Sequence, residues 1–165
     1  MFKLFGALCI VIAGASFGFL KSYMMKKRIE SLSSFLLAFK KISAEISFTR
    51  HRAERVFTDI SKELKMPIFY DAALLIKSKG LKAAWEYALN SHKPNMALSD
   101  KDIATINKFS SSLEYTGEEQ KRSVDTVIKL TSLLLTEAEK SYEKEGRLFR
   151  SAGCLVSVLI AILLY

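Results

Sequence analysis

Apolar residues fill both ends of the chain without a charge, whereas apolar and charged residues alternate between them. No charged side chain lies from Leu4 to Leu20, and none lies from Ser151 to Tyr165. A helix satisfies its backbone hydrogen bonds internally, and about 17 helical residues span roughly 25 Å of a hydrocarbon core that is about 30 Å thick. The pattern therefore predicts transmembrane segments at residues 1–22 and 148–165 and a helical domain at residues 23–147.

The distribution of lysine and arginine predicts the orientation of these segments. Only Lys3 precedes the first apolar segment, whereas Lys21, Lys26, Lys27 and Arg28 follow it. Basic residues also precede the second segment, and no charged residue follows it. Because loops rich in lysine and arginine stay in the cytoplasm, the middle domain is expected there, with both termini on the outer side of the cell membrane.

A cleaved signal peptide is the alternative reading of the first segment. Ala13, Gly14 and Ala15 could form a small-residue cleavage site behind a start that contains Lys3. The basic residues that follow the segment argue against export, because a secreted product would show the reverse order of charge. We therefore interpret the segment as an anchor that is retained.

Spacings of three and four between apolar residues predict helices along most of the middle domain. A first amphipathic stripe continues the N-terminal segment to about Ser47. The basic stretch 49–55 is expected to interrupt this stripe, and a new helix that starts with Ala53 should end before Pro67. The residues of the first stripe are Ile29, Leu32, Leu36, Phe39, Ile42 and Ile46.

Proline, glycine and serine positions predict the boundaries of the shorter helices that follow. Pro67 suits the first turn of a helix that ends before Gly80, and the next helix covers 81–90. Ser99 and Asp102 have the spacing of a capping box at the start of another helix. No stretch alternates with a period of two long enough to predict a strand.

From Glu118 onward, apolar residues predict a second long helix that runs straight into the C-terminal segment. Two long helices that emerge from one membrane plane should run antiparallel. The expected fold is therefore all-α: two long antiparallel helices that continue from the membrane spans and are capped by three to four short helices.

Composition and charge exclude several classes of function. The net charge is +8, but acidic and basic residues are interleaved, which favours a membrane surface or an acidic protein partner over nucleic acid. His51 and His92 have no carboxylate or thiol at a metal-ligand spacing and are expected in exposed loops. We therefore predict no catalytic residue, metal, cofactor or small-molecule substrate.

Small residues in both apolar segments are candidates for helix packing. Gly14 and Gly18 form a GxxxG spacing, which allows two helix backbones to approach closely. Gly153 and Ser157 in the second segment have the same separation, so the two segments could pack on each other. The alternative is that both glycines of the first segment face lipid.

Two further features could mark contacts within the protein or with a partner. Trp85 lies on an apolar helix face and is predicted to anchor the core, in preference to acting as a binding hot spot. Arg50, Arg52 and Arg55 could dock an acidic partner, although a solvated loop is the favoured interpretation.

A series of short landmarks runs along the chain within the two-anchor layout. They are Lys3-Leu4-x-Gly6-Ala7, Glu45-Ile46, Ala84-Trp85 with Leu89, Ser99-x-x-Asp102, Gly117 with Gln120, and Gly146-Arg147-Leu148 with Gly153. Together these landmarks resemble the stage III sporulation protein AB family of endospore-forming bacteria, over essentially the whole chain. Each short motif is unspecific, and the resemblance rests on their order.

The resemblance implies a mother-cell membrane protein of the channel complex that joins mother cell and forespore. It further implies a cytoplasmic domain similar to the type II secretion system F platform protein, partnered by a secretion-type ATPase and other membrane subunits, with no catalytic residue. Two positions depart from the family pattern: the segment from Thr49 to His51 lacks an expected proline, and Glu114 replaces a typical glycine.

The residues leave two other functions open. A membrane-anchored coiled-coil scaffold could self-associate through its long helices, although the apolar stripe drifts after about three heptads. A membrane-tethered hydrolase would require a polar cluster that only the fold assembles. Whether the chain forms a homo-oligomer also stays open.

Overall fold

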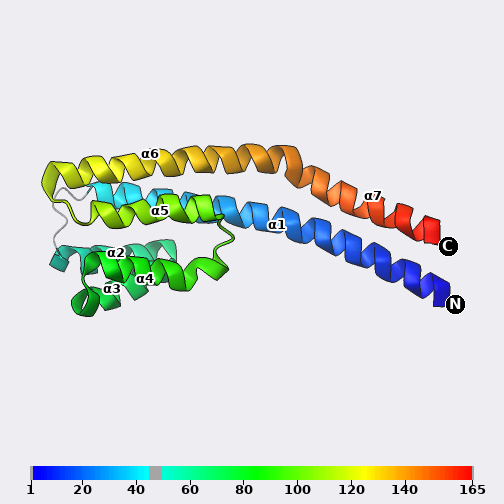
Figure 1. The fold of residues 1–165 in the computed structure, drawn as a ribbon, viewed down its shortest axis with the longest axis horizontal. Helices are drawn as coiled ribbons and strands as arrows, with labels where there is room; N and C mark the ends of the chain where they lie inside the picture. The colour runs from blue at the N-terminus through cyan, green and yellow to red at the C-terminus, as the bar shows by residue number, and fades with distance from the viewer. Residues whose placement is uncertain (1, 45–49, 165) are drawn as a thin grey trace. The chain divides into compact units, whose positions relative to one another are not determined.

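A computed structural model describes residues 2–44 and 50–164, which form helices and contain no strand. The all-α prediction is therefore confirmed for this part of the chain (Figure 1). The elements are α1 (Phe2–Ala44), α2 (Arg50–Leu64), α3 (Pro67–Lys79), α4 (Leu81–His92), the 3-10 turn η1 (Lys93–Asn95), α5 (Asp100–Ser112), α6 (Gly117–Ser141), the π-helical turn η2 (Tyr142–Gly146) and α7 (Arg147–Leu164).

The chain forms two compact units. Unit 1 comprises Met1–Ile29 and Thr136–Tyr165, and unit 2 comprises Glu30–Leu135. Helices α1 and α6 each contribute to both units. The four short helices α2, α3, α4 and α5 all belong to unit 2, in agreement with the three to four short helices predicted from the sequence.

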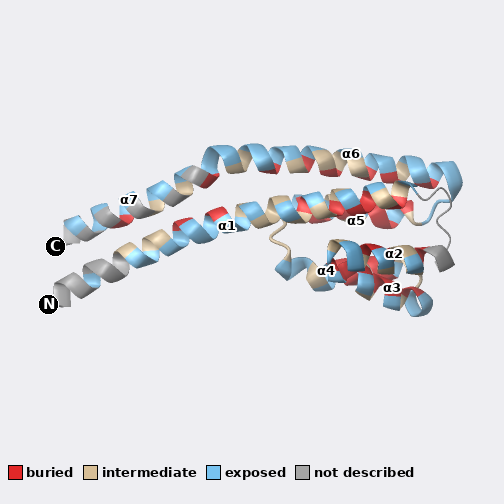
Figure 2. Cartoon of the chain, turned by 180° about the vertical axis from the view of Figure 1, so that it is seen from behind, coloured by how far each residue is buried: buried red, intermediate tan, exposed pale blue. Residues whose placement is uncertain are grey.

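An aromatic cluster forms the core of unit 2. Trp85 of α4 is fully buried, and five phenylalanine rings surround it with centroids between 4.9 and 6.3 Å away. Figure 2 shows the buried positions of this unit on its short helices and on the adjoining part of α1. The cluster joins five helices through Phe35 and Phe39 of α1, Phe57 of α2, Phe69 of α3, Trp85 of α4 and Phe109 of α5.

The boundaries of α3 and α4 follow from proline and glycine, as predicted. Pro67 occupies the first turn of α3, where a missing N–H costs no intrahelical hydrogen bond. Gly80 ends α3 with a φ of 82°, a conformation that glycine adopts without steric strain. Its backbone N–H donates to the Ile76 carbonyl at 3.0 Å, and α4 begins at the next residue.

The predicted capping box at the start of α5 is present. The Ser99 hydroxyl accepts from the Asp102 backbone N–H at 3.2 Å, and the Asp102 carboxylate accepts from the Ser99 N–H at 2.9 Å. These two hydrogen bonds satisfy backbone N–H groups at the start of α5 that have no acceptor within the helix. Asp102 is completely buried.

Substitution Ser99→Ala should lower the free energy of unfolding by about 1 kcal/mol, because the Asp102 N–H loses its acceptor. Urea denaturation of the full chain, followed by circular dichroism, measures this change. Ser111→Ala is the matched control, because Ser111 is an exposed serine in the last turn of the same helix. Equal stability of the two variants would show that the cap contributes nothing.

Helix α2 begins at Arg50, so the helix expected from Ala53 onward is present, and the loop expected for Arg50, Arg52 and Arg55 is wrong. Arginine has a high helix propensity, and the segment contains no proline or glycine. One side of this helix buries Ala53, Phe57 and Ile60, whereas the side chain of Arg55 is exposed. Ser47 and the Glu45-Ile46 landmark lie outside the described residues.

The second long helix does not run straight into the C-terminal segment as predicted. The π-helical turn at Tyr142–Gly146 interrupts it between α6 and α7. Gly146 is buried, and a Cβ atom at this position would lie 2.7 Å from the Cδ2 atom of the Tyr142 ring. The Tyr142 ring therefore packs directly on the backbone of Gly146, where a larger residue would collide with the ring.

Gly146→Val should destabilise the contact between Tyr142 and the turn by about 1–3 kcal/mol, the usual effect of overpacking. Thermal unfolding of the full chain measures this loss. Tyr142→Ala removes the obstructing ring, so Gly146→Val should cost much less in that background. If the two substitutions have additive effects, the ring does not set the requirement for glycine.

Within the described residues, no helix combines the length and the apolar composition needed to cross a membrane. The transmembrane segments expected at residues 1–22 and 148–165 therefore stay predictions.

Candidate functional site

The small residues predicted to pack helices lie together in unit 1. A Cβ atom on Gly14 would lie 2.5 Å from the Ser157 Cβ atom, and one on Gly18 would collide with the Phe149 carbonyl oxygen. A Cβ atom on Gly153 would lie 2.8 Å from the Gly14 carbonyl oxygen. These separations leave no room for a Cβ atom at Gly14, Gly18 or Gly153, so the backbones of α1 and α7 approach each other closely there.

This contact between α1 and α7 is antiparallel. As residue numbers increase along α1, the residues that they meet in α7 have lower numbers. Gly14 lies beside Ser157, and Gly18 lies beside Phe149. The Lys21 ammonium lies 5.9 Å from the Phe149 ring centroid. The Ser157 hydroxyl is nearly buried and donates to the Gly153 carbonyl within α7 at 2.7 Å. The small residues therefore set both the distance and the register between the two helices.

Unit 1 also exposes large apolar side chains around this contact. Phe17 and Leu20 of α1 are 68% and 59% exposed, and Leu155 and Ile162 of α7 are 70% and 71% exposed. A shallow apolar depression runs along one side of α1 and is lined by Ile12, Ala15, Ser16, Phe19, Leu20 and Tyr23. This exposed apolar surface is a candidate for contact with lipid or with an apolar partner.

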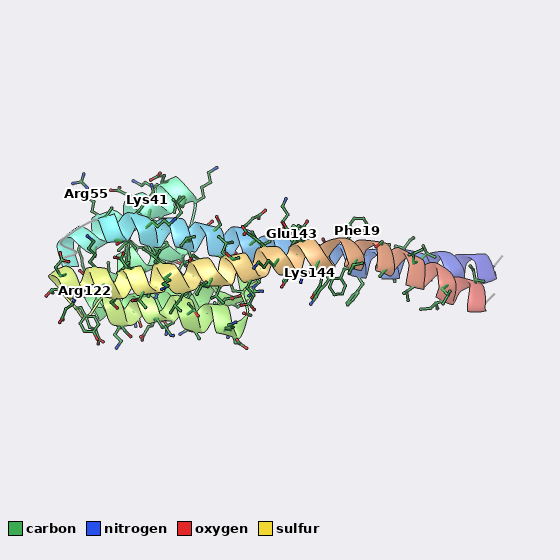
Figure 3. The ribbon with its side chains drawn as sticks, turned by 90° about the horizontal axis from the view of Figure 1, so that it is seen from above. Phe19, Lys41, Arg55, Arg122, Glu143 and Lys144 are labelled. Carbon is green, nitrogen blue, oxygen red and sulfur yellow. The ribbon has the colours of Figure 1, made fainter. Side chains whose placement is uncertain are left out.

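The three arginines considered for partner docking lie in the first half of α2. The side chain of Arg55 is 86% exposed and points away from the helices (Figure 3). Its Nε atom lies 3.8 Å from the Asp59 carboxylate one turn later, a loose contact that leaves the guanidinium accessible. The structure does not describe the side chains of Arg50 and Arg52, so their role in docking stays a prediction.

Ion pairs join neighbouring helices across the surface of unit 2. Lys77 of α3 contacts Glu54 of α2 at 3.1 Å, and Lys41 of α1 contacts Glu63 of α2. The hydrogen bond between Lys82 of α4 and Glu114, at 2.9 Å, raises the pKa of that ammonium group above its ordinary value. These pairs are exposed, so each adds little stability and mainly aligns one helix with the next.

The region around η1 is tied to its neighbours by polar contacts. The Ser31 hydroxyl of α1 donates to the Met96 carbonyl at 2.9 Å. Lys93 contacts Asp100 at 2.8 Å, and this hydrogen bond holds the pKa of the Asp100 carboxyl below its ordinary value. The connection from α4 to α5 is therefore attached to α1 and to the start of α5.

Trp85 lies where a core anchor should lie and is inaccessible to a partner. Its indole Nε1 atom is buried and forms no hydrogen bond with the described residues. The surrounding phenylalanine rings therefore hold the indole by packing alone, and Phe109 has the shortest centroid distance at 4.9 Å.

His92 differs from the exposed loop histidine that the sequence predicts. It is the last residue of α4, and its Nε2 atom lies 2.6 Å from an oxygen of Asp71 in α3. The two residues are 21 positions apart, so their spacing in the sequence carried no signal. Among the described residues, no group of three or more histidine, cysteine, aspartate and glutamate side chains is arranged to hold a metal ion.

These features define an all-helical protein with one aromatic-cored unit and one two-helix unit held together by small residues. Residues 3–165 match the family described as stage III sporulation protein AB, which covers nearly the whole chain. The chain therefore belongs to that family, and the resemblance seen in the sequence is confirmed. This membership assigns the chain a role in sporulation.

A curated relative supports the same family. The chain is 25% identical over 173 residues to stage III sporulation protein AB of Bacillus subtilis (strain 168), and the match covers 99% of each chain. No solved structure matches this chain significantly.

Proposed function

We propose that this protein is a non-enzymatic platform component of the channel complex between mother cell and forespore, and that it couples a cytoplasmic secretion-type ATPase to that channel. The observation that carries the proposal is the family match over residues 3–165. The packed unit 2 supports it, because a coupling protein needs a rigid body that transmits force between partners.

The proposal includes membrane anchoring. Residues 1–22 and 148–165 would insert as two spans, with residues 23–147 in the cytoplasm of the mother cell and both termini on the outer side. The charge asymmetry of the sequence supports this topology, as do the exposed apolar side chains of α1 and α7. The close contact at Gly14, Gly18 and Gly153 would then hold two spans together in lipid.

Fractionation of sporulating mother cells tests the anchoring. The full chain should stay in the membrane pellet after extraction with alkaline carbonate. A variant that lacks residues 148–165 tests the second span separately, because it should retain one anchor and expose its new C-terminus to the cytoplasm. Complete extraction of the intact chain would contradict the membrane part of the proposal.

Deletion of the gene tests the role in sporulation. Heat-resistant spores should be lost and restored by the full chain expressed in the mother cell. Expression in the forespore alone should not restore them, because the proposed ATPase acts from the mother-cell side. Restoration from the forespore would contradict the proposed position in the complex.

A further inference from the structure

Helix α6 buries one continuous stripe of residues. The buried positions recur at intervals of four and three, as expected for one side of an α-helix, and the stripe reaches Ala138 in unit 1. An uninterrupted α-helix would continue the same stripe through Glu145, Leu148 and Ala152. The buried residues of the stripe are Gln120, Val124, Val127, Thr131, Leu134 and Ala138.

The residues of α7 that contact α1 lie one position after the expected ones. Phe149 and Gly153 both lie against Gly18 of α1. The residues one position earlier, Leu148 and Ala152, are exposed, and the exposed fraction of Leu148 is 63%. The contact side of α7 is therefore displaced by one residue from the side that the stripe of α6 predicts.

The π-helical turn η2 accounts for this displacement. A π-helix bonds each N–H to the carbonyl five residues back, whereas an α-helix bonds it four residues back, so a π-helical turn holds one extra residue. Gly146 lies eight positions after Ala138, and both residues are buried. Eight positions make about 2.2 turns of an α-helix, but about 1.9 turns if one residue is absorbed as an extra. With η2 in place, Gly146 therefore lies on the same side of the helix as Ala138.

Packing against α1 explains why the chain adopts this rare turn. Without the extra residue in η2, Ala152 would take the place of Gly153, where a Cβ atom would lie 2.8 Å from the Gly14 carbonyl oxygen. Glu145 would take the place of Gly146, which is buried, and burying a carboxylate is costly. The contact between α1 and α7 therefore favours the register in which η2 holds one extra residue.

The side chains of η2 can accommodate the extra position. Glu143, Lys144 and Glu145 are all exposed, and Figure 3 labels the first two between α6 and α7. The Tyr142 ring packs on Gly146, which has no side chain to obstruct it. The extra residue is thus added among exposed residues and leaves the buried contact intact.

We propose that η2 is a rotational adjustment built into the fold: its extra residue turns α7 by about 100° relative to the last turn of α6 and brings the glycine side of α7 against α1. The glycine side contains Gly153 and Ser157, and the leucine side contains Leu148 and Leu155. Only the glycine side leaves room for a close approach, so the number of residues in η2 decides whether α1 and α7 hold together. The inference concerns unit 1 alone and does not depend on the proposed coupling function.

A deletion and an insertion in η2 of the full-length protein test the proposal. Deletion of Lys144 removes the extra residue, so the turn should become α-helical with the glycine side still against α1. Insertion of an alanine after Lys144 adds a second extra residue, so the leucine side should turn toward α1. The two variants are matched controls for each other, because each changes the length of the turn by one residue at the same exposed position.

Cysteine cross-linking measures which side of α7 faces α1. Lys21→Cys on α1 is combined with Phe149→Cys or Leu148→Cys on α7, in a background without Cys9 and Cys154. A short bismaleimide should join Lys21→Cys to Phe149→Cys in similar yield in the parent and in the deletion variant. In the insertion variant this yield should fall several-fold, and the ratio of the Leu148→Cys yield to the Phe149→Cys yield should rise. Circular dichroism establishes that each variant is folded.

Each outcome decides the proposal. A Phe149→Cys cross-link that survives the deletion and is lost with the insertion would support it. If the cross-link survives both changes, η2 is a flexible joint that does not set the rotation of α7, and the proposal is wrong. Loss of the cross-link in the folded deletion variant would also overturn it. Deletion of Glu143 or of Glu145 removes the extra residue equally well, so failure of all three deletion variants to fold would contradict the proposal too.

Discussion

Gly18→Leu should separate α1 from α7. A Cβ atom on Gly18 would meet the carbonyl oxygen of Phe149 and would lie 3.4 Å from the Gly153 Cα atom. Both obstacles are backbone, which cannot rotate away as a flexible side chain can. We expect the helix contact to lose about 1–3 kcal/mol or more, and the loss grows with the size of the new side chain.

Chemical cross-linking measures this separation directly. Lys21→Cys and Phe149→Cys place thiols on the two helices at a contact seen in the structure, in a background without Cys9 and Cys154. A short bismaleimide should join them efficiently in the parent protein and several-fold less efficiently in Gly18→Leu. Gly6→Leu is the control, because a Cβ atom there meets nothing within 4 Å. Equal yields from Gly18→Leu and Gly6→Leu would show that close packing at Gly18 is unnecessary.

Trp85→Ala should reduce the free energy of unfolding by about 3–5 kcal/mol, the usual cost of removing a large aromatic side chain from a core. The cavity would open between five helices, and five phenylalanine rings would lose a shared neighbour. Since natural domains are stable by only about 5–15 kcal/mol, this loss approaches the total stability of unit 2.

Urea denaturation of the full chain, followed by circular dichroism, tests this prediction. Tyr87→Ala is the control, because Tyr87 lies two residues away on the exposed side of the same helix. It should change the free energy of unfolding by about 0.5 kcal/mol or less. Trp85→Phe should give an intermediate loss, because it keeps part of the ring volume. If Trp85→Ala and Tyr87→Ala are equally stable, the aromatic cluster does not hold unit 2 together.

Local chemistry made much of unit 2 predictable from the sequence. Pro67, Gly80 and Ser99 act on the backbone within one turn of their own positions, so their effects are visible in a short window of sequence. The burial of Trp85 followed from its place on an apolar helix face. The small residues of α1 and α7 could be paired because each set repeats every four positions.

Features that depend on contacts between distant residues could not be predicted from the sequence. The contact between Asp71 and His92 needs α3 and α4 to be folded against each other. The π-helical turn depends on how the Tyr142 ring packs on Gly146, although a glycine inside a helical pattern could have marked the place. Helix α2 starts within the basic stretch because one side of the helix is apolar and buried. The charges of the stretch alone do not indicate this buried side.

Co-purification of the full-length protein with the proposed secretion-type ATPase tests the coupling role most directly. We predict a stoichiometric complex from mild detergent that dissociates as salt is raised, because charged groups on unit 2 contribute to the contact. Recovery of this protein without the ATPase, folded and helical by circular dichroism and at low salt, would contradict the account.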